Sequence, residues 1–289
     1  MPRVAYVNGR YLLHAKAVVH IDDRGYQFAD GVYEVIHVRA GRLVDAQPHL
    51  ERFEYSLGEL RIAPPMGRAA LRLMLEELQA RNALANGLIY FQSTRGVAPR
   101  EHRFPAKART SLVATARRLR ALAPDALEKG VSVVSIPDIR WQRCDIKSLA
   151  LLPNVLGKQR AVEHGAYEAW QVDESGFVTE GTSTNAWIVT TGGRLVTRPL
   201  SHSILAGIVR RSLLSLVDGL PSGFEERPFS LAEARAAREA FLTSSSGFLL
   251  PVTRLDGQPV GAGGVGPVTR ELRRRIDEYV AGEVAGSRS

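Results

Sequence analysis

The stretch Arg140-Trp-Gln-Arg-Cys-Asp-Ile-Lys147-Ser-Leu149 contains one of only five lysines in a chain of 289 residues. Lysine and arginine together number 38, so 33 of the basic residues (38 minus 5) are arginines. An ammonium group can lose its proton when it is desolvated, whereas a guanidinium effectively cannot. A lysine retained in such a chain is therefore a candidate for amine chemistry. Because most lysines are simply solvated, scarcity alone does not select Lys147 from the other four.

The remaining composition is that of a soluble globular chain, with 45% hydrophobic and 24% charged residues. The length allows two domains of ordinary size. No apolar run approaches a membrane span, and the first residues lack the apolar core of a signal peptide, so we expect no membrane partner. The single cysteine, Cys144, cannot form an internal disulfide. These features together predict a cytoplasmic protein.

The net charge of +8 and the pI near 9.9 raise the question of nucleic-acid binding. The arginines are spread along the chain, however, and the short runs at 117–120 and 273–275 fit the polar side of a strand or a helix. We therefore expect no nucleic-acid partner, and expect instead an attraction for small anions. A non-catalytic basic binding protein is an alternative that the charge alone would permit.

The pattern of strands and helices predicts an α+β fold without repeated βαβ units. Asn8-Gly9 is a strong hairpin signal within a strand-like stretch, 4–13. We expect an N-terminal α+β domain over 1–120, an interdomain linker over 121–130 and a C-terminal α/β domain over 131–289. Further strands are expected at 32–40, 43–44, 88–93, 111–115, 131–136 and 239–243. Helices are expected at 49–60, 67–82, 154–164, 208–217 and 267–280, with a short helix opened by the capping box Ser230-Leu-Ala-Glu233.

Two motifs are set aside. Gly261-Ala-Gly263-Gly-Val-Gly266 has the letters of a dinucleotide fingerprint, but the 289-residue chain leaves room after it for one helix and not for the second strand of a βαβ unit. We expect an ordinary glycine-rich loop there. Cys144 and the seven scattered histidines have neither a nucleophile signature nor metal-ligand spacing, so no metal site is expected.

Four polar features remain. Arg100 and His102, two positions apart on a loop, could bind one carboxylate. The segment Leu205-Ala-Gly207-Ile208-Val209 places a glycine before a helix, and Thr243-Ser244-Ser245-Ser246-Gly247 follows a buried strand, so both could bind a phosphate. Glu180, at a strand end, could keep a heteroaromatic nitrogen protonated or merely cap a turn. With the Lys147 amine, these are the parts of a pyridoxal-phosphate enzyme.

Seven segments then carry a resemblance to a known family. They are Asp23-Arg-Gly-Tyr-Gln-Phe-Ala-Asp-Gly-Val-Tyr33-Glu-Val, Pro48-His-Leu-Glu-Arg52, Tyr90-Phe-Gln-Ser-Thr-Arg-Gly, Arg100-Glu-His102, Arg140 to Leu149, Thr179-Glu180-Gly-Thr-Ser-Thr-Asn and Thr243-Ser-Ser-Ser. In this order they resemble the fold-type IV pyridoxal-phosphate aminotransferases, most closely the D-amino acid aminotransferases. The resemblance implies a two-domain α+β homodimer with pyridoxal 5′-phosphate in the interdomain cleft.

The resemblance also implies roles for individual residues. Lys147 would hold the cofactor as a Schiff base and shuttle the substrate α-proton, and Glu180 would pair with the pyridine nitrogen. Tyr33 would bind the substrate α-carboxylate, with Arg100 and His102 contributed across the subunit interface. The phosphate would be held by Arg52, the N–H groups of Ile208 and Val209, and Ser245. Ser183, Leu205 and Ser244 are expected to complete the cofactor site.

The implied reaction is a ping-pong transamination between a D-amino acid, such as D-alanine or D-glutamate, and 2-oxoglutarate or pyruvate. The same fold also supports (R)-amine aminotransferases, branched-chain aminotransferases and aminodeoxychorismate lyases, which remain alternatives. Two positions depart from the family pattern. Val209 replaces a common threonine, which removes a hydroxyl from the expected phosphate site, and Ala150 replaces a common asparagine close to Lys147.

Overall fold

The first hairpin turns at Asn8-Gly9, as the sequence predicts. In the computed structural model, which describes residues 3–119, 126–220 and 223–286, these two residues have φ angles of 46° and 94°. Positive φ at both central residues is what a two-residue hairpin with the normal strand twist requires. The turn joins two antiparallel strands, and their register runs from the pair Val4↔Leu13 to the pair Val7↔Arg10.

The predicted α+β class is confirmed, and the chain divides into two compact units. Unit 1 consists of Met1–Arg120, Ile146–Ala150 and Gly282–Ser289. Unit 2 consists of Ala121–Asp145 and Leu151–Ala281. The short segment Ile146–Ala150, which contains Lys147, therefore belongs to unit 1, whereas the sequence-based division assigns it to the second domain. The physical reason is that Ile146 is 4% exposed and packs into the hydrophobic core of unit 1.

Unit 1 is built on an antiparallel sheet in the order β2-β1-β6-β5-β3-β4, six strands among the described residues. Its strands are β1 (Val4–Val7), β2 (Arg10–Leu13), β3 (Gly31–Arg39), β4 (Arg42–Leu43), β5 (Gly87–Thr94) and β6 (Ser111–Arg118). Its helices are η1 (His14–Lys16), α1 (Arg24–Phe28), α2 (Ala46–Glu59) and α3 (Arg68–Arg81).

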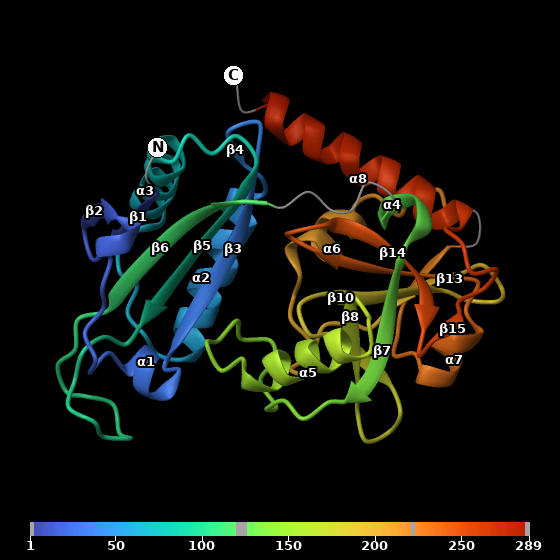
Figure 1. Ribbon diagram of the computed structural model, residues 1–289, viewed down its shortest axis with the longest axis horizontal. Helices are drawn as coiled ribbons and strands as arrows, with labels where there is room; N and C mark the ends of the chain where they lie inside the picture. The colour runs from blue at the N-terminus through green and yellow to red at the C-terminus, as the bar shows by residue number, and fades with distance from the viewer. Residues whose placement is uncertain (1–2, 120–125, 221–222, 287–289) are drawn as a thin grey trace. The chain divides into compact units, whose positions relative to one another are not determined.

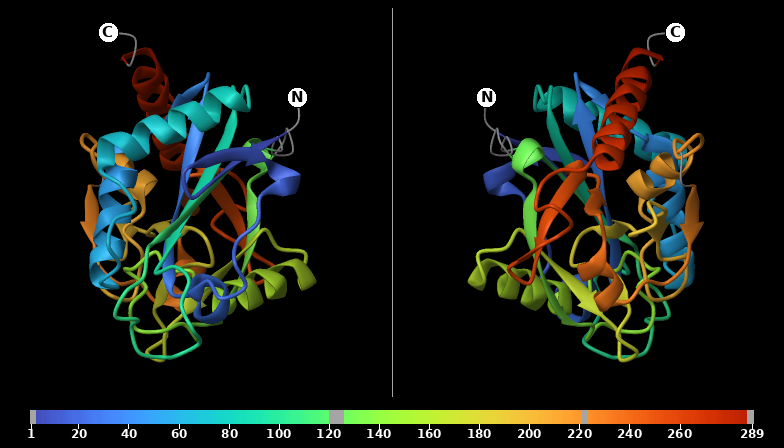
Figure 2. Two further views of the ribbon diagram at one scale, coloured as in Figure 1. Left: turned by 90° about the vertical axis from the view of Figure 1, so that its left-hand side faces the viewer. Right: turned by 90° about the vertical axis from the view of Figure 1, so that its right-hand side faces the viewer.

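Helices α2 and α3 cover one face of this sheet (Figures 1 and 2). Their apolar stripes, with Leu50 and Phe53 on α2 and Leu75 and Leu78 on α3, are at most 1% exposed. They form one core with alternate residues of the strands, such as Ile36 on β3. Apolar residues recur every three to four positions along each helix and every second position along each strand, so they share one face of each element. The polar face of each helix is left in solvent.

Unit 2 contains a larger mixed sheet in the order β12-β11-β10-β13-β14-β7-β8-β9, with β15 paired to β14, nine strands among the described residues. Strand β7 pairs in parallel with both β14 and β8. The strands are β7 (Val131–Pro137), β8 (Glu168–Val172), β9 (Val178–Gly181), β10 (Asn185–Val189), β11 (Leu195–Thr197), β12 (Phe224–Glu226), β13 (Glu239–Ser244), β14 (Phe248–Leu255) and β15 (Gln258–Pro259). The helices are α4 (Ala126–Lys129), α5 (Leu152–Glu163), α6 (Ile208–Leu214), α7 (Leu231–Ala236) and α8 (Pro267–Gly286), of which residues 282–286 are assigned to unit 1.

The helix boundaries differ from expectation at several ends. Helix α6 stops three residues before the predicted end at 217, and α8 continues six residues beyond 280. Ser230 caps α7 as predicted, because its Oγ accepts from the N–H of Glu233 at 3.0 Å. Helix α4 occupies 126–129 of the segment expected to be a linker, while 120–125 lies outside the described residues. The helix α1 was not predicted.

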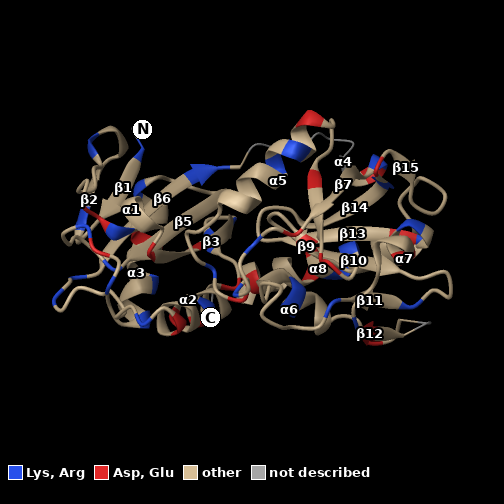
Figure 3. Cartoon of the chain, turned by 90° about the horizontal axis from the view of Figure 1, so that it is seen from below, with Lys and Arg blue, Asp and Glu red and all other residues tan. Residues whose placement is uncertain are grey.

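Basic and acidic residues are both spread over the elements of each unit (Figure 3). The run Arg273-Arg274-Arg275 lies on α8, where its members pair with Asp277, Glu271 and Glu278 on the same helix. Such i,i+3 and i,i+4 pairs are the usual environment of a charged helix surface. Within the described ranges, no helix is long and apolar enough to cross a membrane.

Candidate active site

Lys147 is fixed in unit 1 through its backbone. Its N–H donates to Oγ of Ser56 on α2 at 3.1 Å, and its carbonyl accepts from the N–H of Tyr33 on β3 at 3.0 Å. The chain continues beside β3, because the N–H of Leu149 donates to the carbonyl of Gly31 at 2.9 Å. The Cα of Lys147 is thus held by two elements of unit 1, so its side chain starts from a defined point.

The amine of Lys147 lies over the ring of Tyr33, with Nζ 4.3 Å from the ring centroid. It makes no hydrogen bond or ion pair with any residue that the structure describes. Tyr33 in turn stacks on Tyr90 at a centroid distance of 5.6 Å. Burial, and the neighbouring Tyr33, raise the pKa of Tyr90, so its phenol stays neutral. The structure therefore brings Lys147 and Tyr33 together and leaves the primary amine of Lys147 without a hydrogen-bond or ion-pair partner among the described residues.

Arg52, a predicted phosphate ligand, lies in a buried cluster with Glu34 and His49. Its Nε donates to Oε1 of Glu34 at 2.7 Å and its Nη2 to Oε2 at 2.9 Å. Nδ1 of His49 is 2.7 Å from the same Oε2. Burial alone would raise the pKa of Glu34, but the charges of Arg52 and His49 outweigh it and hold that pKa far below its usual value. Two guanidinium nitrogens are thus committed to Glu34, which fixes the orientation of Arg52.

The predicted carboxylate trap lies on the exposed loop between β5 and β6. The side chains of Arg100 and His102 both contact Phe28, with Cζ of Arg100 5.0 Å and the His102 ring 5.4 Å from its ring centroid. Neither makes a hydrogen bond, ion pair or ring contact with Tyr33 or Lys147 of its own chain, among the residues described. The structure therefore places both predicted trap residues against the ring of Phe28.

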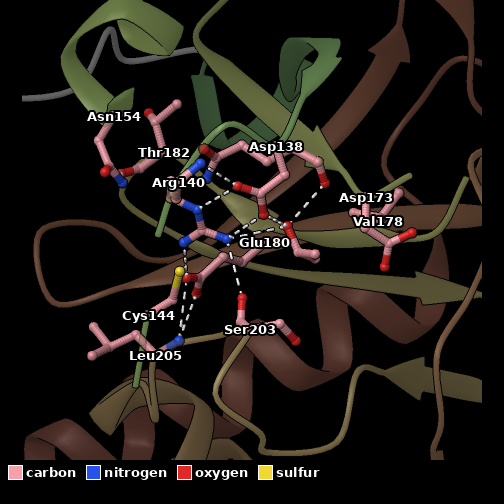
Figure 4. Close-up of polar contacts among 12 residues, drawn as sticks. Asp138, Arg140, Cys144, Asn154, Asp173, Val178, Glu180, Thr182, Ser203 and Leu205 are labelled. Carbon is pink, nitrogen blue, oxygen red and sulfur yellow. Dashed lines mark hydrogen bonds and ion pairs between the residues drawn. The ribbon is translucent and has the colours of Figure 1, made fainter. Parts of the chain in front are cut away.

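Glu180 is the last acid of β9 in unit 2 and is 5% exposed. Its carboxylate accepts from Arg140, Asn185 and Leu205, of which Figure 4 labels Arg140 and Leu205. Nη1 of Arg140 is 2.5 Å from Oε1, and Nδ2 of Asn185 is 3.0 Å from Oε2. The N–H of Leu205 lies 3.2 Å from both oxygens. The buried acid is therefore kept anionic and immobile by these donors, as buried charges require.

Arg140 is itself fixed by a second set of contacts. Nε and Nη2 bind the carboxylate of Asp138 at 2.9 and 2.7 Å, and Nη2 also donates to the carbonyl of Ser203 at 3.1 Å. Burial alone would lower the pKa of Arg140, but the bonds to Asp138 and the charge of Glu180 raise it. The same partner lowers the pKa of Asp138 against the effect of burial. One guanidinium thus bridges two buried carboxylates.

The predicted phosphate-binding residues Ile208 and Val209 open α6. Gly207 precedes them with an extended backbone, and a Cβ at this position would lie 1.9 Å from Oδ1 of Asn185. Only glycine fits beside Asn185, whose Nδ2 also donates to the carbonyl of Leu205 at 3.0 Å. Asn185 therefore joins the predicted phosphate segment to Glu180. Leu205 contributes through its N–H to Glu180, a role that its apolar side chain does not reveal.

The three predicted serines have different surroundings. Oγ of Ser183 donates to Oε2 of Glu168 at 2.8 Å, which commits this hydroxyl to a buried acid. Oγ of Ser244 lies 3.2 Å from Oγ of Ser246 and accepts from the N–H of Gly247, so it closes the turn after β13. Ser245, between them, is half-buried on the same turn. These contacts do not test a role in cofactor binding, which remains a prediction for all three serines.

Three residues with evident roles at this site were missed in the sequence. Arg140 donates to Glu180 and is itself bound by Asp138. Asn185 donates both to Glu180 and to the carbonyl of Leu205. Arg140 and Asn185 stand at the edges of two family-like segments quoted above, which was the available signal. The role of Arg140 as a partner of Glu180 could not be read from the sequence, because Thr179 and Glu180 lie about 40 residues away.

Comparison with known proteins gives the class of the protein. The family model for "Amino-transferase class IV" matches residues 31–255. This range includes every predicted site residue, from Tyr33 to Ser245. The chain therefore belongs to the class IV aminotransferases.

Several curated relatives of the chain are named D-alanine aminotransferase. The proteins of that name from Staphylococcus aureus (strain MSSA476) and Bacillus licheniformis are each 38% identical to the chain, over 275 and 278 residues. These alignments cover 95% and 96% of the chain and 97% of each relative. The chain thus matches these relatives over nearly their full length.

Solved structures agree on the fold. The branched-chain amino acid aminotransferase of Escherichia coli superposes with a TM-score of 0.90 at 24% identity, covering 98% of this chain and 96% of that one. A hypothetical aminotransferase from Mycobacterium tuberculosis gives 0.85 at 21% identity, covering 97% and 99%. At this level of identity the likeness establishes the α+β fold, and the predicted fold-type IV architecture is confirmed.

Proposed function

We propose that the protein catalyses pyridoxal-phosphate-dependent transfer of an amino group from a D-amino acid to a 2-oxo acid. The observation that carries this proposal is the uncommitted amine of Lys147, fixed through its backbone in a chain 38% identical to D-alanine aminotransferases over 95% of its length. An amine nucleophile with no competing partner is what attachment to a carbonyl cofactor requires.

The residues present fit pyridoxal 5′-phosphate. A primary amine and a buried carboxylate kept anionic by Arg140 are the two groups that its aldehyde and its pyridine nitrogen need. We assign Lys147 to the aldehyde and Glu180 to the nitrogen. Arg52, Ser245 and the N–H groups of Ile208 and Val209 are assigned to the phosphate, and Ser183, Leu205 and Ser244 to the surrounding shell. When bound, the cofactor supplies an electron sink for the substrate α-carbon.

The side chains divide the remaining work. Lys147 is assigned the transfer of the substrate α-proton, because its Nζ donates to no hydrogen-bond acceptor among the described residues and lies beside the ring of Tyr33. Tyr33 orients the amine and limits water at one side through its ring. Glu180 holds a proton on the ring nitrogen, and Arg140 keeps the carboxylate in the ionised form that this needs.

Binding of the substrate α-carboxylate is assigned to Tyr33, with Arg100 and His102 from the second subunit of a homodimer. Two facts support a contribution across subunits. Both loop residues lie against Phe28, and neither makes a hydrogen bond, ion pair or ring contact with Tyr33 or Lys147 of its own chain, among the residues described. The apolar residues Val18, Ile21 and Tyr26, which are 75 to 78% exposed in one chain, also suit burial in a dimer. The cytoplasm is the proposed compartment.

The function is tested by a panel of amino donors with the purified enzyme and its cofactor. We expect activity with D-alanine and D-glutamate, using 2-oxoglutarate or pyruvate as acceptor, and no comparable activity with L-leucine. Replacing Arg100 with Ala should raise KM for D-alanine by about tenfold or more, because a charge-assisted contact to the carboxylate is lost. A preference for L-leucine would assign the protein to branched-chain transamination, and a preference for (R)-1-phenylethylamine to the amine branch.

A further inference from the structure

A buried arginine of α1 donates hydrogen bonds to the backbone of the loop that carries Arg100 and His102. Arg24 is 3% exposed. Its Nη1 donates to the carbonyl of Glu101 at 2.5 Å and its Nη2 to the carbonyl of His102 at 3.4 Å. One acceptor, Glu101, lies between the two proposed carboxylate ligands in the sequence, and the other, His102, is one of those ligands. The planar fork of a guanidinium can bind two neighbouring carbonyls, whereas a lysine ammonium offers a single point charge.

Asp30 fixes Arg24 and connects it to a second buried arginine. Oδ2 of Asp30 accepts from Nε of Arg24 at 2.7 Å and from Nε of Arg95 at 2.8 Å, and Oδ1 accepts from Nη2 of Arg95 at 3.0 Å. Arg95 stacks on the ring of Phe104, with Cζ 3.6 Å from its centroid. The guanidinium of Arg24 therefore binds the 100–104 loop at Glu101 and His102, and the guanidinium of Arg95 contacts it at Phe104.

Phe28 completes the support. Its ring lies under Arg24 at 4.9 Å, and under the side chains of Arg100 and His102 as described above. Helix α1 is pinned to the end of β5, because a Cβ on Gly25 would lie 2.2 Å from Cγ2 of Thr94, and Oγ1 of Thr94 donates to Asp23 at 3.0 Å. The ring and the guanidinium are thus mounted on a rigid base.

An exposed polar loop does not need buried ion pairs in order to fold, and burying them is costly. Here two buried arginines and their shared acid are directed at the backbone and the ring of a five-residue stretch whose own polar side chains face solvent. Such support is expected where a loop must present two side chains at a fixed separation. We infer that Arg24 is a positioning residue for the substrate α-carboxylate, acting through the loop of Arg100 and His102. This inference rests on the proposed function of that pair.

The test compares the holoenzyme with its Arg24→Gln and Arg24→Lys variants. Asp30 keeps Arg95 as a partner in both, so no buried carboxylate is left without a cation. Arg24→Gln should raise KM for D-alanine by about tenfold or more while kcat changes less than about threefold. Arg24→Lys, which retains the charge and loses the fork, should fall between. The reaction with phenylhydrazine, a carbonyl reagent without a carboxylate, should keep its wild-type rate.

A second readout needs no activity. The loop contains a tryptic site after Arg103, whose side chain is 85% exposed. Release of the loop in Arg24→Gln should increase the rate of cleavage at this site about fivefold or more, measured by mass spectrometry, because cleavage follows local opening. Arg72→Gln, which removes an exposed pair with Glu76 on α3, is the matched control and should leave both readouts at the wild-type value.

The outcomes separate this inference from the proposed function. If Arg100→Ala raises KM but Arg24→Gln changes neither KM nor cleavage, the positioning role is overturned and the proposed function stands. If cleavage rises in Arg24→Gln with KM unchanged, the anchor exists without serving the carboxylate, and the inference is again overturned. If Arg100→Ala leaves KM unchanged, the assignment of the trap itself fails.

Discussion

Nη1 of Arg140 lies 2.5 Å from Oε1 of Glu180, and both side chains are buried. The guanidinium also binds Asp138, so it is the centre of a three-membered ionic group in unit 2. The contacts with Arg140 therefore fix the orientation of the Glu180 carboxylate, which we assign to the cofactor nitrogen, and favour its ionised form. The cost of burying Glu180 is offset by contacts within unit 2.

Removal of this cation should destabilise the protein. Arg140→Met leaves Asp138 and Glu180 buried without their shared partner, and breaking a buried pair in this way costs about 3 kcal/mol or more. We expect a correspondingly lower free energy of unfolding in urea at pH 7. Arg254→Met, an exposed arginine of β14 in the same unit, is the control and should lie within about 0.5 kcal/mol of the wild type.

The loss should depend on pH in a defined direction. The pKa of Asp138 in the folded state lies below its ordinary value because of Arg140, despite burial. Such a group contributes stability that is present above its unfolded-state pKa, about 4, and is lost as the pH falls through the folded-state value. The difference in unfolding free energy between the wild type and Arg140→Met should therefore shrink below about pH 4. A difference that grows on acidification would contradict the assigned ion pair.

Lys147→Ala should abolish covalent attachment of the cofactor. We expect transamination to fall by at least about a thousandfold, because both the nucleophile and the proton carrier are removed. After borohydride reduction, the mass of the cofactor should appear on the wild-type peptide that contains Lys147 and on no peptide of the variant. Lys16→Ala, an exposed lysine of η1, should behave as the wild type. Labelling of the Lys147→Ala protein at another lysine would refute the assignment.

Two glycines should respond oppositely to the same substitution. In Gly207→Ala the new methyl group would collide with Oδ1 of Asn185 at 1.9 Å, so the link between α6 and Glu180 must shift. We expect a loss of about 1 to 3 kcal/mol and weaker retention of the cofactor. Gly58→Ala lies on an exposed position of α2 with nothing within 4 Å of its Cβ. It should stabilise the protein by about 0.5 to 1 kcal/mol, as replacing a helical glycine by alanine does.

Cys144 should be unreactive in the folded protein. Its thiol is 9% exposed and donates to the carbonyl of Trp141, and burial raises its pKa to about 11. At pH 8 this leaves about a hundredfold less thiolate than an ordinary cysteine has, and the thiolate is the reactive form. Thiol titration with DTNB should therefore be slow in buffer and fast in urea. Equal rates would show that the segment 140–147 opens readily in the native state.

The architecture could be predicted from the sequence where local signals decide it. The hairpin at Asn8-Gly9 follows from two positive φ angles, and the start of α7 from the hydroxyl of Ser230. The predicted end of α6 at 217 was wrong, because the helix ends at Leu214 and Oγ of the next residue, Ser215, donates to the carbonyl of Ser212 at 2.7 Å. Lys147 was identified from its family-like segment, since its contacts to Ser56 and Tyr33 are not visible in the sequence.

The supporting ionic groups could not be predicted, and the reason is physical. A salt bridge depends on two side chains meeting in space, and the partners Arg140 and Glu180 are 40 residues apart, as Asp30 and Arg95 are 65 apart. With 33 arginines in the chain, composition gives no means of choosing among them. Arg52 was predicted to bind the phosphate from its family-like segment, and that role stays a prediction, whereas its pairing with Glu34 emerged only from the fold.

Because it includes the segment Ile146–Ala150, unit 1 is built from stretches that are not contiguous in the sequence. A recombinant fragment that ends at Arg120 would lack the residues that satisfy Oγ of Ser56 and the N–H of Tyr33, and would leave a vacancy where Ile146 packs. Such a fragment would carry the carboxylate loop and Arg52 but no reactive amine. Splitting the protein after Arg120 would therefore leave the first piece incomplete, and a synthetic peptide containing 146–150 would be needed to restore these contacts.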